Sequence, residues 1–346
     1  MLTLNGKSNK KTRKFATDYS FTNLSESVTQ INKIKKFVKS VKGKYQNFLV
    51  LGIGGSALGA KCLQHSLAYK ENKLIVLDNI DPDHIANIEE KIDPKKTLFI
   101  VISKSGNTTE TVALYEYFKT KAPKENFVFI SGEKNETLKS DFHMPEDICG
   151  RFSILTPVGL LPAALIGINI EKIIEGAVSQ INAPSQANNF AQIQFESEKP
   201  INVIMPYSQK LTALADWYRQ LLAESIGKEG KGITPVLALG ATDQHSQLQL
   251  YNDGPADKLI IFLETEKFTA NLPEFSSLMK IEKDATEKSL KARNITIKIK
   301  QIDEKSIGEL IMFFELSITF LAEMMGVNAF DQPGVENTKK LIKNSL

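Results

Sequence analysis

Cysteine and histidine are scarce in this sequence of 346 residues. The two cysteines, Cys62 and Cys149, have no metal-binding spacing and indicate no disulfide framework, so we expect a reducing cytoplasm. The four histidines form no pair, and the sequence contains neither a cysteine cluster nor an HExxH motif. A metal site is therefore not expected.

Strong net charge and long apolar runs are also missing. The formal net charge of +3 is too small to indicate a nucleic acid or a membrane as partner. The first twenty residues have no apolar core, which argues against a secretory signal. The longest apolar run, residues 307–325, contains three glutamates, so we expect a buried helix there rather than a membrane span.

Two sections of alternating strands and helices organise the chain. Short segments rich in Val, Ile, Leu or Phe predict buried parallel strands, and helical stretches separate them. The expected strands are 48–51, 73–78, 97–103 and 126–130, then 201–205, 235–239, 258–263 and 295–299. The pattern indicates an α/β chain with two doubly wound domains, whose ligands should lie at the carboxyl ends of the strands.

The domain boundaries follow from the same pattern. We expect a polar, basic N-terminal extension over residues 1–45, with an amphipathic helix over 24–41 that packs on the first domain. The first domain should cover 46–185 and the second 190–346, including the C-terminal helices. The segment NAPSQANN at 182–189 is expected to be a linker or turn between them.

Four glycines lie within LGIGGSALGA, residues 51–60, between a predicted strand and a predicted helix. Such a loop brings backbone N–H groups close to an anion. A Walker A loop would need a lysine where Ala60 stands. A dinucleotide loop fits the spacing G-x-G-x-x-A at 52–57, with Asp78 as the acid after the next strand. A sugar-phosphate loop would use the hydroxyl of Ser56.

A second polar loop, SKSGNTTET at 103–111, follows the third predicted strand. Ser103 or Ser105 can cap the helix that begins there. Capping needs only one hydroxyl, however, and this loop also carries Thr108, Thr109 and Lys104. Several hydroxyls, a lysine and free N–H groups suit the three oxygens of a phosphomonoester. A sugar phosphate is therefore preferred to a dinucleotide as the ligand. Asp78 is then expected to have a structural role.

The second loop resembles the phosphosugar-binding loop of sugar isomerase (SIS) domains. GIGGSALG at 52–59 resembles the first signature of one SIS family, the glucose-6-phosphate isomerases. Four further stretches are similar to signatures of that family, in its order: GRFS at 150–153, QLLAESIGKEGKG at 220–232, GATDQHSQLQ at 240–249 and FDQPGVENTK at 330–339. Together the six stretches span most of the chain. The resemblance implies two SIS-type domains.

The resemblance also implies catalytic roles for four residues. Glu224 moves a proton between carbons 1 and 2 of the sugar. Without the family resemblance, its position would predict a solvated glutamate at a helix end. His245 opens the sugar ring with help from Lys339, and imidazole suits this because its pKa lies near neutrality. Arg151 places a fixed positive charge against the enediolate.

Substrate-binding residues are implied in the same way. Gln220 lies four residues before Glu224, on the same helical face, and positions the substrate. The phosphate is assigned to seven residues from the two loops and the C-terminal signature: Gly55, Ser56, Ser103, Lys104, Ser105, Thr108 and Gln332.

The implied activity is the reversible conversion of glucose 6-phosphate and fructose 6-phosphate through a cis-enediolate, without a cofactor. The resemblance further implies a cytoplasmic homodimer in which the histidine reaches across the interface to the active site. Two alternatives stay open. A bifunctional phosphoglucose/phosphomannose isomerase is suggested by Gly106 and Asn107, which stand where most members have phenylalanine and threonine. The other is a SIS-type regulator that binds a sugar phosphate without turning it over.

Overall fold

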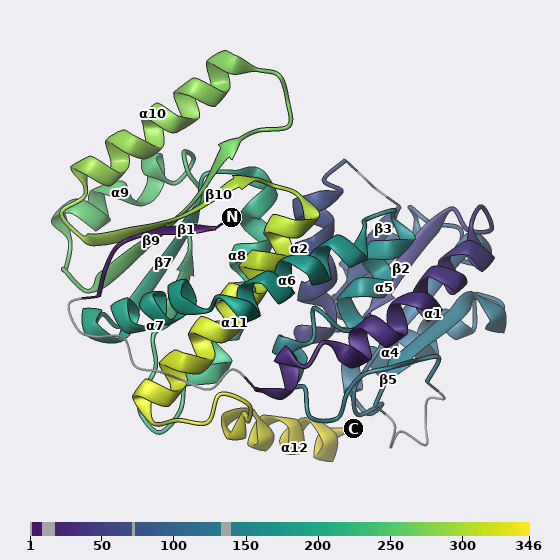
Figure 1. Ribbon diagram of the computed structural model, residues 1–346. Coiled ribbons are helices and arrows are strands. Elements are labelled where there is room, and N and C mark those ends of the chain that lie inside the picture. The colour runs from purple at the N-terminus through teal and green to yellow at the C-terminus, as the bar shows by residue number, and fades with distance from the viewer. Residues whose placement is uncertain (1, 9–17, 71–72, 133–139) are drawn as a thin grey trace. The chain divides into compact units, whose positions relative to one another are not determined.

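The computed structural model describes residues 2–8, 18–70, 73–132 and 140–346 (Figure 1). The chain divides into two compact units. The first unit comprises Asp18–Gln64, Ala68–Ile174 and Val335–Leu346. The second unit comprises Met1–Thr17, His65–Leu67 and Glu175–Gly334. Each unit is described separately.

A five-stranded parallel sheet forms the centre of the first unit. Its strands are β2 (Asn47–Leu51), β3 (Leu74–Leu77), β4 (Thr97–Ile102), β5 (Phe127–Ser131) and β6 (Phe142–His143), in the order β3-β2-β4-β5-β6. The helices are α1 (Ser25–Val41), α2 (Gly55–Leu67), α3 (Pro82–Glu89), α4 (Thr109–Lys119), α5 (Pro157–Leu165) and α12 (Glu336–Ser345). Every residue of β4 is buried, as the continuous apolar sequence TLFIVI predicts for a strand covered on both faces.

The core of the first unit joins its central strands to α4. Phe99 of β4 stacks on Phe127 at a centroid distance of 4.8 Å and lies 5.1 Å from Phe118 of α4. Phe99 and Phe118 are both fully buried. Burial of one such side chain stabilises the fold by about 1.5–3 kcal/mol. This packing holds the loop between β4 and α4 at the edge of the sheet.

The second unit has a mostly parallel sheet of the same kind. Its strands are β1 (Thr3–Asn5), β7 (Ile201–Pro206), β8 (Thr234–Leu237), β9 (Lys258–Lys267) and β10 (Arg293–Gln301), in the order β1-β10-β9-β7-β8. Its helices are α7 (Ser185–Ser197), α8 (Thr212–Ile226), α9 (Gln244–Asp253), α10 (Pro273–Ser289) and α11 (Glu304–Met325), and α6 (Ile170–Asn182) leads into it. The predicted class, α/β with two doubly wound and mostly parallel sheets, is confirmed.

Two local features differ from the expectation. Residues 3–5 form β1, which pairs antiparallel with β10 in the second unit. The segment expected as a linker is largely helical, because α6 ends at Asn182 and α7 begins at Ser185. Helix α7 buries Ala187 and Phe190, so tertiary packing outweighs the weak helix propensity of its polar residues.

The two sheets share one strand arrangement. In each unit the first main strand (β2 or β7) lies inside the sheet, the next strand (β3 or β8) pairs on one side of it, and the following strand (β4 or β9) on the other. The connections therefore diverge between β2 and β4, and again between β7 and β9. Such a switch point opens a crevice at the carboxyl ends of the strands, where ligands bind in doubly wound folds.

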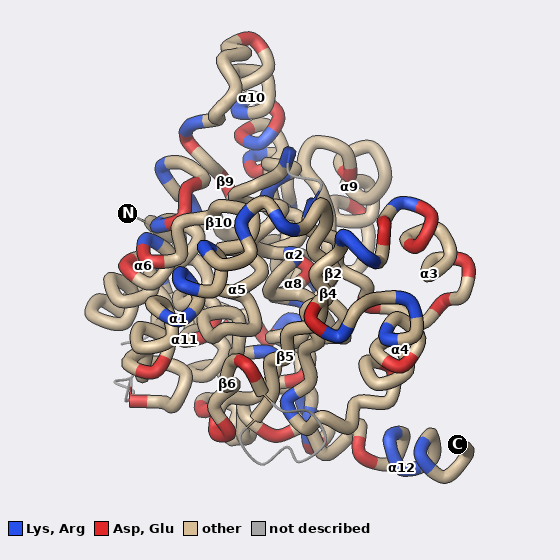
Figure 2. The backbone as a smooth tube through the Cα atoms, turned by 90° about the vertical axis from the view of Figure 1, so that its right-hand side faces the viewer, with Lys and Arg blue, Asp and Glu red and all other residues tan. Residues whose placement is uncertain are grey.

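Charged residues of both signs are interspersed along both units, as Figure 2 shows, in keeping with the small net charge.

The apolar run at 307–325 lies within α11, which packs against α7 and α8 in the second unit. Among the helices of the described ranges, none has the length and apolar character needed to cross a membrane.

Helix α11 contains one buried carboxyl group. Glu315 is 0% exposed, and neither of its carboxyl oxygens has a hydrogen-bond partner in the described part of the chain. Burial raises the pKa of Glu315 well above its ordinary value of 4.5. The group is therefore protonated and neutral within the apolar core.

This burial predicts that stability depends on pH. In the unfolded chain Glu315 ionises near pH 4.5, whereas in the folded chain burial raises its pKa, so it keeps its proton to a higher pH. The free energy of unfolding is therefore highest below pH 4.5, and it falls by about 1.4 kcal/mol per pH unit as the pH rises toward the pKa of Glu315 in the folded chain. We expect Glu315→Gln to remove this dependence. The denaturant concentration at its unfolding midpoint should therefore rise relative to that of wild type as the pH increases from 5 to 8. Glu323→Gln, on the exposed side of α11, is the control. A constant difference between Glu315→Gln and wild type would contradict the prediction.

Candidate functional site

Both predicted phosphate loops lie at the switch point of the first sheet. The glycine loop follows β2 and the hydroxyl loop follows β4, and these strands are neighbours, with Leu51 paired to Val101. Because parallel strands end at the same edge, the two loops leave the sheet side by side. The expectation that they follow adjacent strand ends is confirmed.

Close backbone packing explains one glycine of the first loop. A Cβ atom on Gly55 would lie 2.3 Å from the carbonyl carbon of Gly150 and 2.8 Å from the backbone nitrogen of Arg151. Glycine is therefore required at the first position of α2, where the helix meets the GRFS turn. Gly54 precedes it with φ of 56°, a left-handed conformation that also favours glycine. The structure thus brings Gly55 and the start of α2 to Arg151, whose side chain is buried.

The hydroxyls of the second loop point toward one another. Ser103 Oγ and Thr108 Oγ1 are 3.0 Å apart, and Ser103 is 1% exposed. Ser105 Oγ accepts a hydrogen bond of 3.3 Å from the backbone N–H of Asn107. Gly106 lies between them with φ of 67°. The loop therefore folds back so that Ser103, after the strand, meets Thr108, before the helix.

The expectation that Ser103 or Ser105 caps the following helix is wrong. The N-cap of α4 is Thr108, and within the described chain no side chain makes a capping hydrogen bond there. The hydroxyl of Thr108 is turned to Ser103 instead. The N–H groups of the first turn of α4 therefore lack a side-chain cap, and the positive end of the helix dipole remains available for an anion.

Lys104 and Lys61 have different partners. The Lys104 ammonium donates to the carbonyl oxygens of Glu146, at 2.6 Å, and Ile148, at 2.9 Å. It therefore ties the second loop to the segment that leads to Arg151. Lys61 of α2 lies 2.6 Å from the Asp78 carboxylate, which accounts for the structural role expected of this acid.

In the second unit, Gln220 and Glu224 lie together near the carboxyl end of α8. The Gln220 amide Nε2 donates to Glu224 Oε1 at 3.0 Å. This confirms that the two residues share a helical face, as their spacing of four predicts. The Glu224 carboxylate is half-buried, so the amide restrains it in one orientation.

His245 is exposed and is the second residue of α9. Its neighbour Asp243 accepts hydrogen bonds of 2.6 Å from the backbone N–H of Leu239 and from Ser246 Oγ. Burial alone would raise the pKa of Asp243, but these hydrogen bonds and one from Gln247 outweigh burial and lower it. Asp243, which no sequence motif marks, therefore holds the loop that carries His245.

Lys228 connects the end of α8 to the C-terminal signature. Its ammonium lies 2.6 Å from Asp331 Oδ1 and also donates to the carbonyl oxygen of Asn328, and its side chain is only 7% exposed. Lys231 donates to the carbonyl oxygen of Met325 at 2.9 Å. The two lysines of GKEGKG therefore hold the segment before Gln332 against the loop that follows Glu224. Both lysines belong to the stretch 220–232 that resembles a family signature, but their backbone partners are 100 and 94 residues away in the sequence and only the fold reveals them.

Lys339 lies on α12, where its side chain is exposed and pairs with Glu336 at 2.8 Å. This i,i+3 contact explains its conformation in the structure. Within the described ranges, no group of three or more His, Cys, Asp or Glu side chains is arranged to hold a metal ion.

Comparisons with known proteins place these features in a family. Residues 9–238 match the family model of phosphoglucose isomerase. The glucose-6-phosphate isomerase of Carboxydothermus hydrogenoformans is 40% identical, over 90% of this chain and 81% of that protein. The enzyme of the same name from Methanocaldococcus jannaschii is 35% identical, over 88% of this chain and 84% of that protein.

A solved structure agrees in fold. The crystal structure of a glucose-6-phosphate isomerase from Chlamydia trachomatis superposes with a TM-score of 0.83 and covers 97% of this chain and 75% of that one, at 21% identity. The likeness covers both units. Together with the family model, which matches more than half of the sequence, these relatives show that the chain belongs to the phosphoglucose isomerase family.

Proposed function

We propose that this chain catalyses the reversible isomerisation of glucose 6-phosphate and fructose 6-phosphate, with Glu224 as the group that transfers the proton. The observation that carries this assignment is the hydrogen bond between Gln220 and the half-buried Glu224 carboxylate. A general base must hold one orientation toward the carbon whose proton it removes. The relatives named glucose-6-phosphate isomerase do not favour the bifunctional enzyme or the non-catalytic regulator.

The phosphate is assigned to the loops of the first unit. The Ser103 and Thr108 hydroxyls and the N-terminus of α4, which has no side-chain cap among the described residues, offer donors to phosphate oxygens. Gly55 and Ser56, at the start of α2, offer a second helix N-terminus on the neighbouring strand end. The assignment also includes Ser105, Lys104 and Gln332. Remote binding of the phosphate helps to position the reacting carbons.

The proposed reaction moves one carbon-bound proton from C2 to C1 and one hydroxyl proton from O2 to O1, and it leaves the phosphate unchanged. His245, with Lys339, opens the ring of the sugar. Glu224 then removes the proton from C2 of the open-chain aldose, which forms the cis-enediolate, and returns it to C1 to give the ketose. Arg151 stabilises the negative charge that develops on the enediolate oxygens.

Glu224→Gln tests the proton transfer. We expect kcat to fall by about 10²–10⁴-fold, because the amide cannot accept the proton. Binding of fructose 6-phosphate, measured by calorimetry on the inactive variant, should be largely retained. Glu229→Gln, in the exposed loop after α8, is the matched control and should keep wild-type activity in a coupled assay. Near-normal turnover by Glu224→Gln would remove Glu224 as the base.

Thr108→Val tests the phosphate site. The change keeps the shape of the side chain and removes the hydroxyl that meets Ser103. Loss of a hydrogen bond to a charged group is worth about 1.5–3 kcal/mol, so we expect KM to rise by roughly 10–100-fold. Thr120→Val, at the other end of α4, is the control. An unchanged KM and an unchanged Kd for inorganic phosphate would place the phosphate elsewhere.

We further propose that the enzyme is a homodimer and works in the cytoplasm. The exposure of His245 supports a dimer, because a group that acts on substrate is normally enclosed. In the described part of the chain no disulfide involves Cys62 or Cys149, in keeping with a reducing compartment. Sedimentation equilibrium should give twice the mass of 38.5 kDa. A monomer that retains full activity would contradict the proposed dimer.

A further inference from the structure

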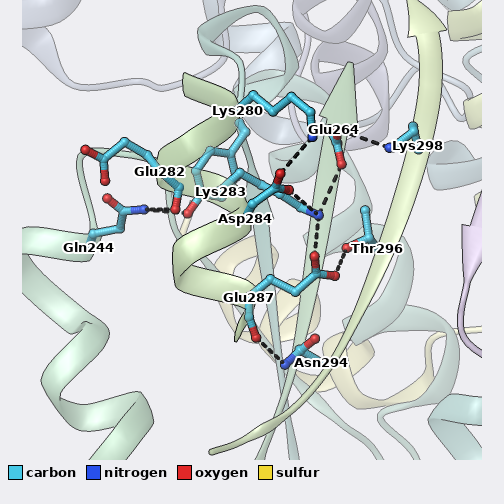
Figure 3. A network of polar contacts seen from close by, with 11 residues as sticks. Gln244, Glu264, Lys280, Glu282, Lys283, Asp284, Glu287, Asn294, Thr296 and Lys298 are labelled. Carbon is cyan, nitrogen blue, oxygen red and sulfur yellow. Dashed lines mark hydrogen bonds and ion pairs between the residues drawn. The ribbon is translucent and has the colours of Figure 1, made fainter. Parts of the chain in front are cut away.

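Gln244, the residue before His245, is fixed by three oxygens of the second unit. Its amide Nε2 donates to Tyr207 Oη at 2.7 Å, to the backbone oxygen of Glu282 at 3.1 Å and to Thr286 Oγ1. Figure 3 shows this amide turned toward α10, which carries Glu282. An amide nitrogen has two protons, so three acceptors saturate it. Gln244 is the first residue of α9, and its side chain therefore anchors the first turn of that helix to α10.

Helix α10 is in turn held against β9 by a cluster of charges, of which Lys283 and Glu264 are buried. Lys283 of α10 has a side chain only 4% exposed and lies 3.1 Å from Glu264 of β9 and 2.6 Å from Glu287. Glu264 also contacts Lys298 of β10 at 3.2 Å. Figure 3 shows these side chains converging between the helix and the sheet.

Glu287 adds a hydrogen bond from Thr296 of β10, at 2.6 Å. Paired charges disfavour other packing arrangements, because those would leave a charge without a partner. The part of α10 to which Gln244 binds is therefore held against the sheet by several ion pairs.

Within a single chain His245 is exposed, so its own unit packs little around the imidazole. Its place is then set by its backbone, which is restrained on both sides. Asp243 holds the preceding loop through Leu239 and Ser246, and Gln244 holds the first turn of α9 against α10.

We propose that Gln244 is a positioning residue for His245. It presents the imidazole in one place for the ring-opening step, although it does not itself contact the substrate. This inference rests on the role proposed above for His245. A displacement of about 1 Å at a reacting group can reduce turnover by about 10²-fold, so a restraint one residue away has a measurable effect.

A double-mutant cycle separates positioning from a merely structural role. Gln244→Ala, His245→Ala and the double variant are compared for kcat and KM on glucose 6-phosphate. We expect Gln244→Ala to lower kcat by about 10–100-fold, with KM changed by less than about two-fold, because the phosphate contacts are unaltered. In the His245→Ala background, the same substitution should change kcat by less than about two-fold, since its effect passes through the imidazole.

Gln249→Ala is the matched control. Gln249 lies on the same helix, is exposed, and donates to Asp253 at 2.9 Å. It should leave kcat unchanged in both backgrounds.

Should Gln244→Ala fail to fold, as judged by thermal unfolding, Thr286→Val removes one acceptor without changing the shape of the side chain. It should show a smaller loss of kcat that is again absent in the His245→Ala background.

The outcomes are distinguishable. An equal loss of kcat in both backgrounds would show a structural role only and would overturn the inference. Full activity of Gln244→Ala, with a loss in His245→Ala, would overturn the inference but leave the role of His245 intact. Full activity of His245→Ala would overturn both. Non-additive losses, with the control unchanged, would establish Gln244 as a positioning residue.

Discussion

Two parallel strands that pair side by side, β2 and β4, deliver their following loops to the same edge of the first sheet. One loop enters α2 and the other enters α4, so two helix N-termini lie at neighbouring strand ends. The connections diverge there, which prevents a crossing helix from covering the edge. An anion is thereby offered N–H groups and hydroxyls, and a net charge of only +3 on the protein is sufficient. The phosphate assignment depends on this pairing, because neither loop alone distinguishes a sugar phosphate from a dinucleotide.

Two lysines, Lys104 in the second loop and Lys228 after α8, donate hydrogen bonds to backbone carbonyl oxygens. Lys104 holds the carbonyl oxygens of Glu146 and Ile148, which fixes the approach to Arg151. Lys228 does the same for Asn328, close to Gln332. An ammonium that donates to carbonyl oxygens can secure segments far apart in the sequence with a single side chain. These contacts hold the loops of the proposed phosphosugar site to distant segments of the backbone.

The second unit accommodates buried charge in two ways. Around Lys283, each charge is paired, and the resulting cluster fixes α10 to β9 and β10. Glu315, by contrast, has no hydrogen-bond partner in the described chain and stays neutral inside α11. The first arrangement specifies how elements pack, whereas the second reduces stability as the pH rises. Only the paired cluster is connected to the proposed active-site residues, because Gln244, next to His245, donates to the backbone of α10.

Much of this protein was determined by the sequence alone. Continuous apolar segments predicted the buried strands, and the spacing of Gln220 and Glu224 predicted their contact, because both depend on residues a few positions apart. Long-range contacts were decided only by the tertiary structure. These include the pairing of residues 3–5 with β10 and the acceptors of Lys228 and Gln244. The choice of Thr108 rather than Ser103 as N-cap, although local, was also visible only in the structure. The reason is physical: strand and helix periodicity is written in neighbouring residues, whereas the partner of a long polar side chain is set by which distant segments the fold brings within reach.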